Sequence, residues 1–226
     1  MHITSLPGKY GIGTLGNQAY KFVDFLRKSG QTYWQILPIG PTGYGDSPYQ
    51  SFSTYAGNPY LIDLEILCDK NLIDRSYLDS INWGDDYFNI DFEKIYLNKL
   101  NVLRKVYNKF KEGNTEEFCE FIDKNKFWLK DYALFMAVKQ HFNMVSWQQW
   151  PDESIKNRKE DSIIEYSNKL ADEINFFMFV QFLFYSQWNR LKSYANSLGI
   201  KIIGDVPIYV GLDSSDVWAN PQIFCL

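Results

Sequence analysis

The sequence predicts an α/β protein with a long, mainly helical insertion. Near each end of the chain a helical pattern is followed by a short strand pattern, which is typical of such a fold. With 226 residues, 46% of them hydrophobic, the chain is long enough for a sizeable core. We expect three segments: residues 1–60 with the first β/α units and a long loop, residues 61–168 with the helical insertion, and residues 169–226 with a helix, a strand and the loop after it.

The first helix and strand lie within the first forty or so residues. Apolar side chains recur there at helical spacing: Ala19, Phe22, Val23 and Leu26. Gly30 supplies a left-handed cap at the end of this helix. Residues 33–39 are rich in β-branched and aromatic side chains and predict a buried strand. We also expect the end of a strand at residues 2–4.

The middle of the chain predicts helices. Between residues 61 and 151 apolar side chains recur at helical spacing, most clearly in one stripe: Tyr96, Leu100, Leu103, Tyr107 and Phe110. Asn114 with Glu117 resembles a capping box at the start of a further helix. The charged residues of 152–165 predict a solvated connector, with binding of a partner as the less favoured alternative.

The second helix and strand follow this connector. Residues 170–198 are apolar on nearly all sides in their first half, which predicts a helix packed deeply between other elements. Gly199 ends this helix, and residues 200–203 predict a short strand. Asp205 lies just beyond the C-terminal end of that strand.

Composition argues against several classes of function. The net charge of −4 gives no broad positive field for nucleic acid. The three widely spaced cysteines support neither a disulfide framework nor a thiolate metal site, and two histidines argue against an imidazole-bound metal. The most apolar run, residues 176–185, is shorter than the roughly 20 residues that cross a bilayer. We expect a soluble cytoplasmic protein with no metal or organic cofactor and no nucleic-acid or membrane partner.

The most informative stretch is TGYGDSPYQSFSTYAGNPYLIDL, residues 42–64. Its glycines permit backbone conformations closed to other residues. It also carries many aromatic rings: Tyr44, Tyr49, Phe52, Tyr55 and Tyr60. Such a loop either stacks its rings on a sugar and hydrogen-bonds the sugar hydroxyls, or packs on itself with the tyrosines filling space. Residue chemistry alone leaves both interpretations open.

A second stretch, IKIIGDVPIYVGLDSSDVWANPQIF, covers residues 200–224. Asp205, at the mouth of a strand, either orients a substrate hydroxyl or a catalytic neighbour, or accepts hydrogen bonds from loop amides. Residues 213–216, Asp-Ser-Ser-Asp, are typical of a helix N-terminus, where such side chains cap exposed amides.

These two stretches, together with HITSLPGKYGIGTLG (residues 2–16) and YWQILP (residues 33–38), resemble the 4-α-glucanotransferases of glycoside hydrolase family 77, also called amylomaltases or disproportionating enzymes. The motifs stand in family order, and the resemblance covers essentially the whole chain. It implies the N-terminal part of a TIM (β/α)8 barrel with a helical insertion subdomain. It also implies transfer of α-1,4-glucan segments between maltooligosaccharides through a covalent glycosyl-enzyme intermediate.

The resemblance also implies roles for individual residues. Ser47 and Tyr49 lie beside the donor sugar, with Tyr49 as a stacking platform, and Asp205 lies near the nucleophile and the donor sugar. The family's nucleophilic Asp, its acid/base Glu and its stabilising Asp sit in motifs that follow residues 216–221, so we expect them after Leu226. Retaining transfer needs two carboxyl groups about 5 to 5.5 Å apart, and Asp46 with Asp205 does not plausibly supply that pair.

No catalytic residue is therefore assigned within this chain, and the 226-residue chain alone is expected to be inactive. The predicted ligand is a maltooligosaccharide or another α-glucan. Two alternatives stay open at this point. One is an α-glucan hydrolase on the same scaffold, in which water replaces the acceptor sugar. The other is a non-catalytic glucan-binding remnant.

Overall fold

The computed structural model describes residues 1–225 except residues 44, 46, 87, 114 and 115. The chain forms two compact units. The first comprises Met1–Ile39, Asn58–Asn114 and Leu183–Val206, and the second Gly40–Gly57, Thr115–Phe182 and Pro207–Leu226. Both units are assembled from separate stretches of chain, and their boundaries differ from those of the three expected segments. The division into 1–60, 61–168 and 169–226 stays a prediction.

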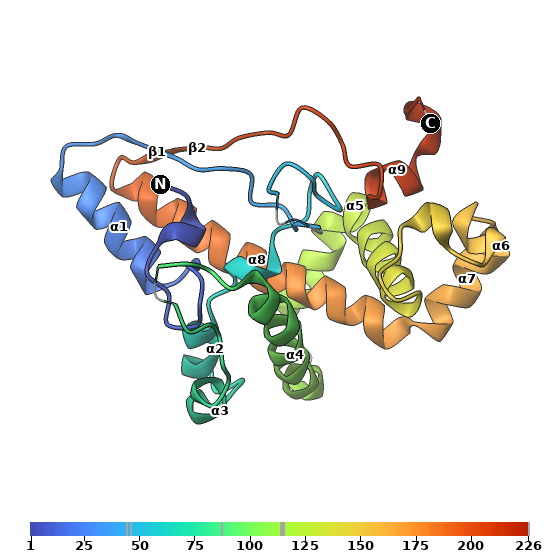
Figure 1. The fold of residues 1–226 in the computed structure, drawn as a ribbon, viewed down its shortest axis with the longest axis horizontal. Coiled ribbons are helices and arrows are strands. Elements are labelled where there is room, and N and C mark those ends of the chain that lie inside the picture. Colours follow the sequence, from blue (N-terminus) through green and yellow to red (C-terminus); the bar gives the residue numbers. More distant parts are fainter. Residues whose placement is uncertain (44, 46, 87, 114–115, 226) are drawn as a thin grey trace. The chain divides into compact units, whose positions relative to one another are not determined.

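The first unit contains a two-stranded parallel sheet (Figure 1). Helix α1 (Asn17–Lys28) precedes strand β1 (Tyr33–Gln35), which pairs with β2 (Lys201–Ile203). Both helix α1 and strand β2 confirm the predictions, and Gly30 has the expected positive φ of 71°.

Strand β1 differs from its prediction in two respects. It spans three residues rather than 33–39, and it is only half buried, with Trp34 inside and Tyr33 and Gln35 exposed. The ladder ends soon after the Ile36 amide donates to the Ile203 carbonyl at 3.0 Å. Pro38 cannot continue it because proline has no backbone N–H.

The strand end expected at residues 2–4 is wrong. Ile3–Ser5 is instead a short 3-10 helix, η1. Its hydrogen bonds are local, from the Ser5 amide to the His2 carbonyl and from the Leu6 amide to the Ile3 carbonyl. Each of these hydrogen bonds joins residues that are three apart in the sequence, so these backbone amides and carbonyls are satisfied without a neighbouring strand.

The remaining elements of the first unit are helical, as predicted. They are η2 (Pro59–Leu61), α2 (Leu64–Asp69), α3 (Arg75–Asp79), α4 (Phe92–Phe110) and η3 (Lys111–Gly113). In α4 the predicted stripe is partly wrong, because Tyr96 is exposed. The buried face starts one residue earlier, at Ile95, and continues through Lys99, Val102 and Val106.

The second unit is also built mainly from helices. They are α5 (Glu116–His141), η4 (Trp147–Gln149), α6 (Glu153–Lys156), α7 (Glu160–Lys169), α9 (Ser215–Ala219) and η5 (Pro221–Ile223). The solvated connector expected at 152–165 is wrong, because α6 and α7 occupy most of it. Asp152 is the N-cap of α6. The hydroxyl of the buried Tyr166 on α7 donates a hydrogen bond to Asp152 at 3.0 Å and thereby joins α7 to α6. Asn114 of the expected capping box lies outside the described residues.

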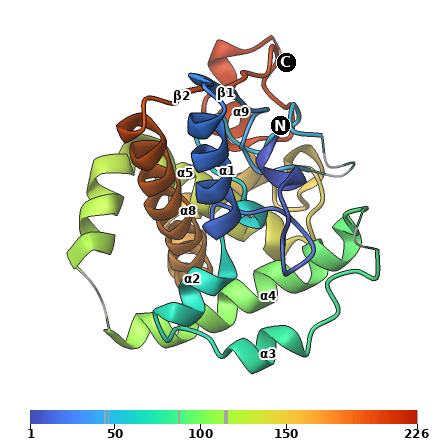
Figure 2. The same cartoon turned by 90° about the vertical axis from the view of Figure 1, so that its left-hand side faces the viewer.

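Helix α8 (Ala171–Ser197) contributes its first part to the second unit and its last part to the first unit. Its buried run includes Phe176, Phe179 and Phe184, which confirms the deeply packed helix, and Gly199 follows it with a φ of 78°. Figure 2 shows α1 beside the end of α8, where the Tyr194 hydroxyl donates to Asp24 at 2.5 Å. No helix among the described residues is long and apolar enough to cross a membrane.

The first unit buries a lysine. Lys99 on α4 has no exposed surface, and its Nζ donates to the Ile62 carbonyl at 2.6 Å. Burial lowers the pKa of Lys99 from 10.5 to about 7, against the opposing effect of the Asp63 carboxylate. Desolvation thus outweighs the attraction of a nearby negative charge at this site.

We predict that Lys99 makes stability depend on pH. Its folded pKa is lower than its unfolded pKa, so between about pH 7 and pH 10 the unfolded chain binds more protons and the free energy of unfolding rises with pH. In Lys99→Met the rise between about pH 7 and pH 9 should be smaller by about 2 kcal/mol. Urea unfolding of both proteins at the two pH values measures this. Parallel pH profiles for the two proteins would contradict it.

Candidate functional site

The long loop Gly40–Gly57 lies in the second unit, and its described residues, all but 44 and 46, form no regular helix or strand. An antiparallel bridge pairs Thr42 with Ser51 and closes the outer part of the loop. After this bridge, in residues 51–56, serine side chains form hydrogen bonds with the loop backbone. The Ser51 hydroxyl donates to the Ser53 carbonyl at 2.8 Å, and the buried Ser53 hydroxyl accepts from the Ala56 amide at 3.3 Å. For these described residues, the irregular loop agrees with the sequence prediction.

The predicted substrate residues Ser47 and Tyr49 form a turn at the outer part of this loop. The Ser47 hydroxyl accepts from the Tyr49 amide at 3.4 Å, and the Ser47 carbonyl accepts from the Gln50 amide at 3.2 Å. This arrangement is a serine-nucleated turn. It holds Ser47 half-buried and leaves Tyr49 45% exposed. Tyr44 and Asp46 lie outside the described residues.

A buried glutamine on α8 holds the end of the loop. Gln181 has no exposed surface, and its side-chain amide pairs with both backbone groups of Gly57. The Gly57 amide donates to Oε1 at 2.7 Å, and Nε2 donates to the Gly57 carbonyl at 3.0 Å. The glutamine therefore replaces the strand partner that the loop lacks. Sequence reasoning missed this role, although a glutamine inside the apolar run 176–185 is the signal that marks it.

The N-terminus of α9 holds the middle of the loop. The Ser215 amide and hydroxyl both donate to the Phe52 carbonyl, at 2.8 and 3.1 Å, and the Thr54 amide donates to Asp216 at 2.9 Å. Burial raises the pKa of the Asp216 carboxyl. Ser214 caps the helix by accepting from the Val217 amide, which confirms the helix N-terminus predicted at 213–216.

Asp205, the third predicted substrate residue, follows β2 in the first unit. Its side chain is exposed, and Oδ1 accepts from the Val206 amide at 2.9 Å. This hydrogen bond agrees with the interpretation of Asp205 as an acceptor for loop amides. Because Ser47 and Tyr49 belong to the other unit, a joint role for the three residues stays a prediction.

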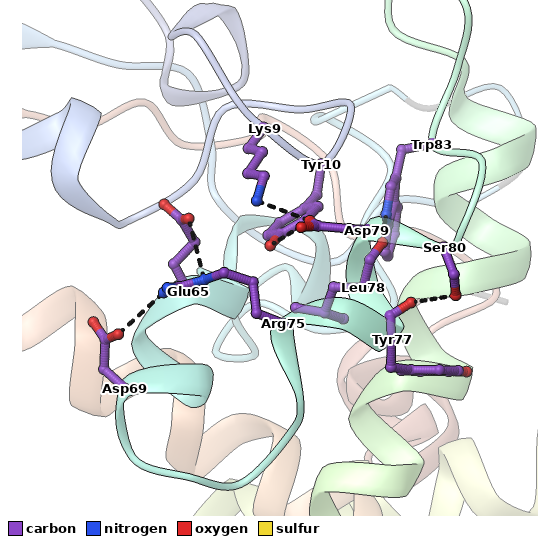
Figure 3. Close-up of polar contacts among 10 residues, drawn as sticks. All are labelled: Lys9, Tyr10, Glu65, Asp69, Arg75, Tyr77, Leu78, Asp79, Ser80 and Trp83. Carbon is purple, nitrogen blue, oxygen red and sulfur yellow. Dashed lines mark hydrogen bonds and ion pairs between the residues drawn. The ribbon is translucent and has the colours of Figure 1, made fainter.

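The first unit also contains a cavity of 270 Å³ that sequence reasoning did not predict. Two of its polar lining residues are paired with each other: the Thr14 hydroxyl donates to Asp63 at 2.6 Å, and Asp63 also caps α2. At the rim, Lys9 forms an ion pair with Asp79 at 2.8 Å, which Figure 3 shows beside Tyr10. Hydrogen bonding to Lys9 lowers the pKa of Asp79. We interpret this network as structural support for the segment before α1.

Among the residues that the structure describes, no three His, Cys, Asp or Glu side chains are grouped to hold a metal ion. The three cysteines are all free thiols, two of them exposed.

The comparison with known proteins places the chain in one class, the glycoside hydrolases. Residues 1–226 match the model of glycoside hydrolase family 77, described as 4-alpha-glucanotransferase, and the chain belongs to that family. It is 55% identical over its whole length to the 4-alpha-glucanotransferase of Clostridium butyricum and 46% identical to that of Thermus thermophilus. Among solved structures, it matches amylomaltase from Streptococcus agalactiae in complex with acarbose, with a TM-score of 0.97 and 44% identity over the whole chain.

The chain spans less than half the length of these relatives. It covers 46% of the Clostridium protein, 45% of the Thermus protein and 46% of the Streptococcus structure. The family resemblance carried by the motifs is thus confirmed.

We predict that Gln181→Leu destabilises the protein by about 2 to 4 kcal/mol, because it leaves a buried amide and a buried carbonyl of Gly57 without partners. The same change at Gln187, which pairs in the same way with Asp63, is the matched control. Hydrogen exchange should accelerate near Gly57 in the first variant and near Asp63 in the second. Equal exchange at Gly57 in wild type and Gln181→Leu would argue against the assigned role.

Proposed function

We propose that the full-length protein carrying this chain is a 4-α-glucanotransferase that moves α-1,4-glucan segments between maltooligosaccharides. The observation that carries the proposal is the match of the entire chain both to the family model and to an amylomaltase solved with a bound oligosaccharide analogue, acarbose. No nucleic-acid or membrane partner enters this proposal.

The proposed architecture is the beginning of a (β/α)8 barrel. Each strand of the small sheet follows a helix, α1 before β1 and α8 before β2, and the strands are parallel. In such barrels the loops after the C-terminal ends of the strands build the active site. The loop Gly40–Gly57 follows β1, and Asp205 follows β2. Both segments thus come from the side of the strands that supports substrate binding.

Within the loop, we assign Tyr49 to stacking on the donor sugar. A sugar presents an apolar face of C–H groups, and an exposed tyrosine ring offers a complementary surface. Ser47 has two contributions: its hydroxyl shapes the turn that holds Tyr49, and its remaining hydrogen-bonding capacity is available to a sugar hydroxyl.

For Asp205 we propose an electrostatic role. The transition state of glycosyl transfer gains positive character at the anomeric carbon, and a carboxylate at a strand end stabilises such charge. The retaining reaction also needs a nucleophilic carboxylate and an acid/base carboxyl, and we assign neither role to a residue of this chain.

The function is tested by incubating the full-length gene product with maltotriose. We expect glucose together with oligosaccharides longer than maltotriose. Asp205→Asn should lower kcat more than it raises KM, since the charge acts mainly in the transition state. Glucose and maltose without longer products would indicate a hydrolase instead. An Asp205→Asn protein with unchanged kcat and reduced thermal stability would assign Asp205 to loop structure alone.

We predict that the ring of Tyr49 matters more than its hydroxyl. Tyr49→Ala should lower kcat/KM by an amount equivalent to about 1 to 3 kcal/mol, whereas Tyr49→Phe should keep most of the activity. Tyr33→Ala is a matched control, because Tyr33 is also about half exposed but lies on β1 before the loop begins. If Phe proves as damaging as Ala, the hydroxyl and not the ring contacts the sugar.

A further inference from the structure

A buried lysine lies beneath the loop. Lys139 on α5 keeps only 2% of its side chain exposed. Its Nζ donates to the Asp213 carboxylate at 2.5 Å and to the Val145 carbonyl at 2.9 Å. The same nitrogen lies 5.1 Å from the centroid of the Phe52 ring. The ammonium group therefore connects α5, the segment before α9 and the loop.

The Asp213 carboxylate is itself fixed on its other side. Its Oδ1 accepts from the Trp147 amide at 3.2 Å, and the Trp147 indole donates to the Leu212 carbonyl at 2.8 Å. Asp213 also directly precedes Ser214, the N-cap of α9. The negative partner of Lys139 is thus part of the segment that leads into α9, and α9 in turn binds the loop backbone.

Phe52 connects Lys139 and α9 to the base of the loop, the part around the Thr42–Ser51 bridge. Its carbonyl is held by Ser215, as described above. Its ring lies against Gly43, where an added Cβ would approach to 3.4 Å. The preceding residue, Ser51, forms the bridge to Thr42. The Phe52 ring is therefore close to both the ammonium of Lys139 and Gly43, and with the Thr42–Ser51 bridge it ties together the two sides of the base of the turn that carries Ser47 and Tyr49.

We propose that Lys139 is a positioning residue that holds the Ser47–Tyr49 turn in place through Phe52 and Asp213. Its charge is central to this role, because the carboxylate and the ring face both attract a cation, whereas an apolar side chain of the same length forms no ion pair with the carboxylate. The functional part of the proposal rests on the assignment of Ser47 and Tyr49 to the donor sugar. Its structural part, the immobilisation of the loop, stands independently.

The test compares Lys139→Met with Lys99→Met in the full-length gene product. Both substitutions remove a buried lysine amino group, but Lys99 lies in the first unit and donates to a carbonyl outside the loop. We expect Lys139→Met to accelerate hydrogen exchange of the described amides between residues 42 and 54. It should also raise KM for maltotriose by about tenfold with a smaller change in kcat. Lys99→Met should change neither quantity.

Two outcomes decide between the proposal and its competitors. Unchanged exchange and unchanged KM in a folded Lys139→Met protein would overturn it, and so would an equal change in both lysine variants. If wild type transfers no glucan, the proposed function fails, whereas the exchange measurement still tests the anchoring. If Lys139→Met does not fold, Phe52→Leu serves in its place, because it removes the ring and keeps the ion pair. Wild-type exchange and KM in Phe52→Leu would then overturn the proposal.

Discussion

The structure around the candidate site depends on one constraint: a loop without helix or strand must still satisfy its backbone polar groups. A buried amide or carbonyl without a partner costs about 1 to 3 kcal/mol. In the loop Gly40–Gly57 some partners are serine hydroxyls of the loop itself, and others are side chains from distant helices: Gln181 on α8 and Ser215 and Asp216 on α9. The loop that carries Ser47 and Tyr49 is thus ordered both by its own serines and by polar groups of the helices.

Helix α8 repeats the same device in both units. Gln181 pairs with Gly57 in one unit, and Gln187 pairs with Asp63 in the other, each through one donor and one acceptor. In both cases a side-chain amide reproduces the two hydrogen bonds that a neighbouring strand would supply. This explains why α8 contains two glutamines with almost no exposed surface. The side-chain oxygen and nitrogen of each glutamine both have hydrogen-bond partners, so burial of the amide costs little free energy.

The elements that could be predicted from the sequence are those marked by a pattern within a short stretch of residues. Helices α1 and α8 follow from apolar spacing and from the glycines at positions 30 and 199, and the start of α9 follows from its capping residues. Helices α6 and α7 were missed because their sequence is mostly charged and shows no clear apolar spacing. The contact that joins them, between Tyr166 and Asp152, has no local sequence signal. The pairing of Lys139 with Asp213, 74 residues away, and of Gln181 with Gly57, 124 residues away, leaves no local signal. Ser47, Tyr49 and Asp205 were chosen largely through the family resemblance, because residue chemistry alone left their roles open.

The two buried lysines show how the surroundings decide what the same side chain does. Lys99 donates to a backbone carbonyl, and burial lowers its pKa to about 7, so its ammonium loses its proton easily. Lys139 faces a carboxylate, a carbonyl and the faces of two aromatic rings, all of which attract a cation. The carbonyl beside Lys99 accepts a hydrogen bond from a neutral amine as well as from an ammonium, whereas an ion pair with Asp213 and cation–π contacts with the rings need a positive charge. Lys139 therefore contributes an ion pair, a hydrogen bond to a carbonyl and cation–π contacts, which an apolar residue of equal volume cannot form.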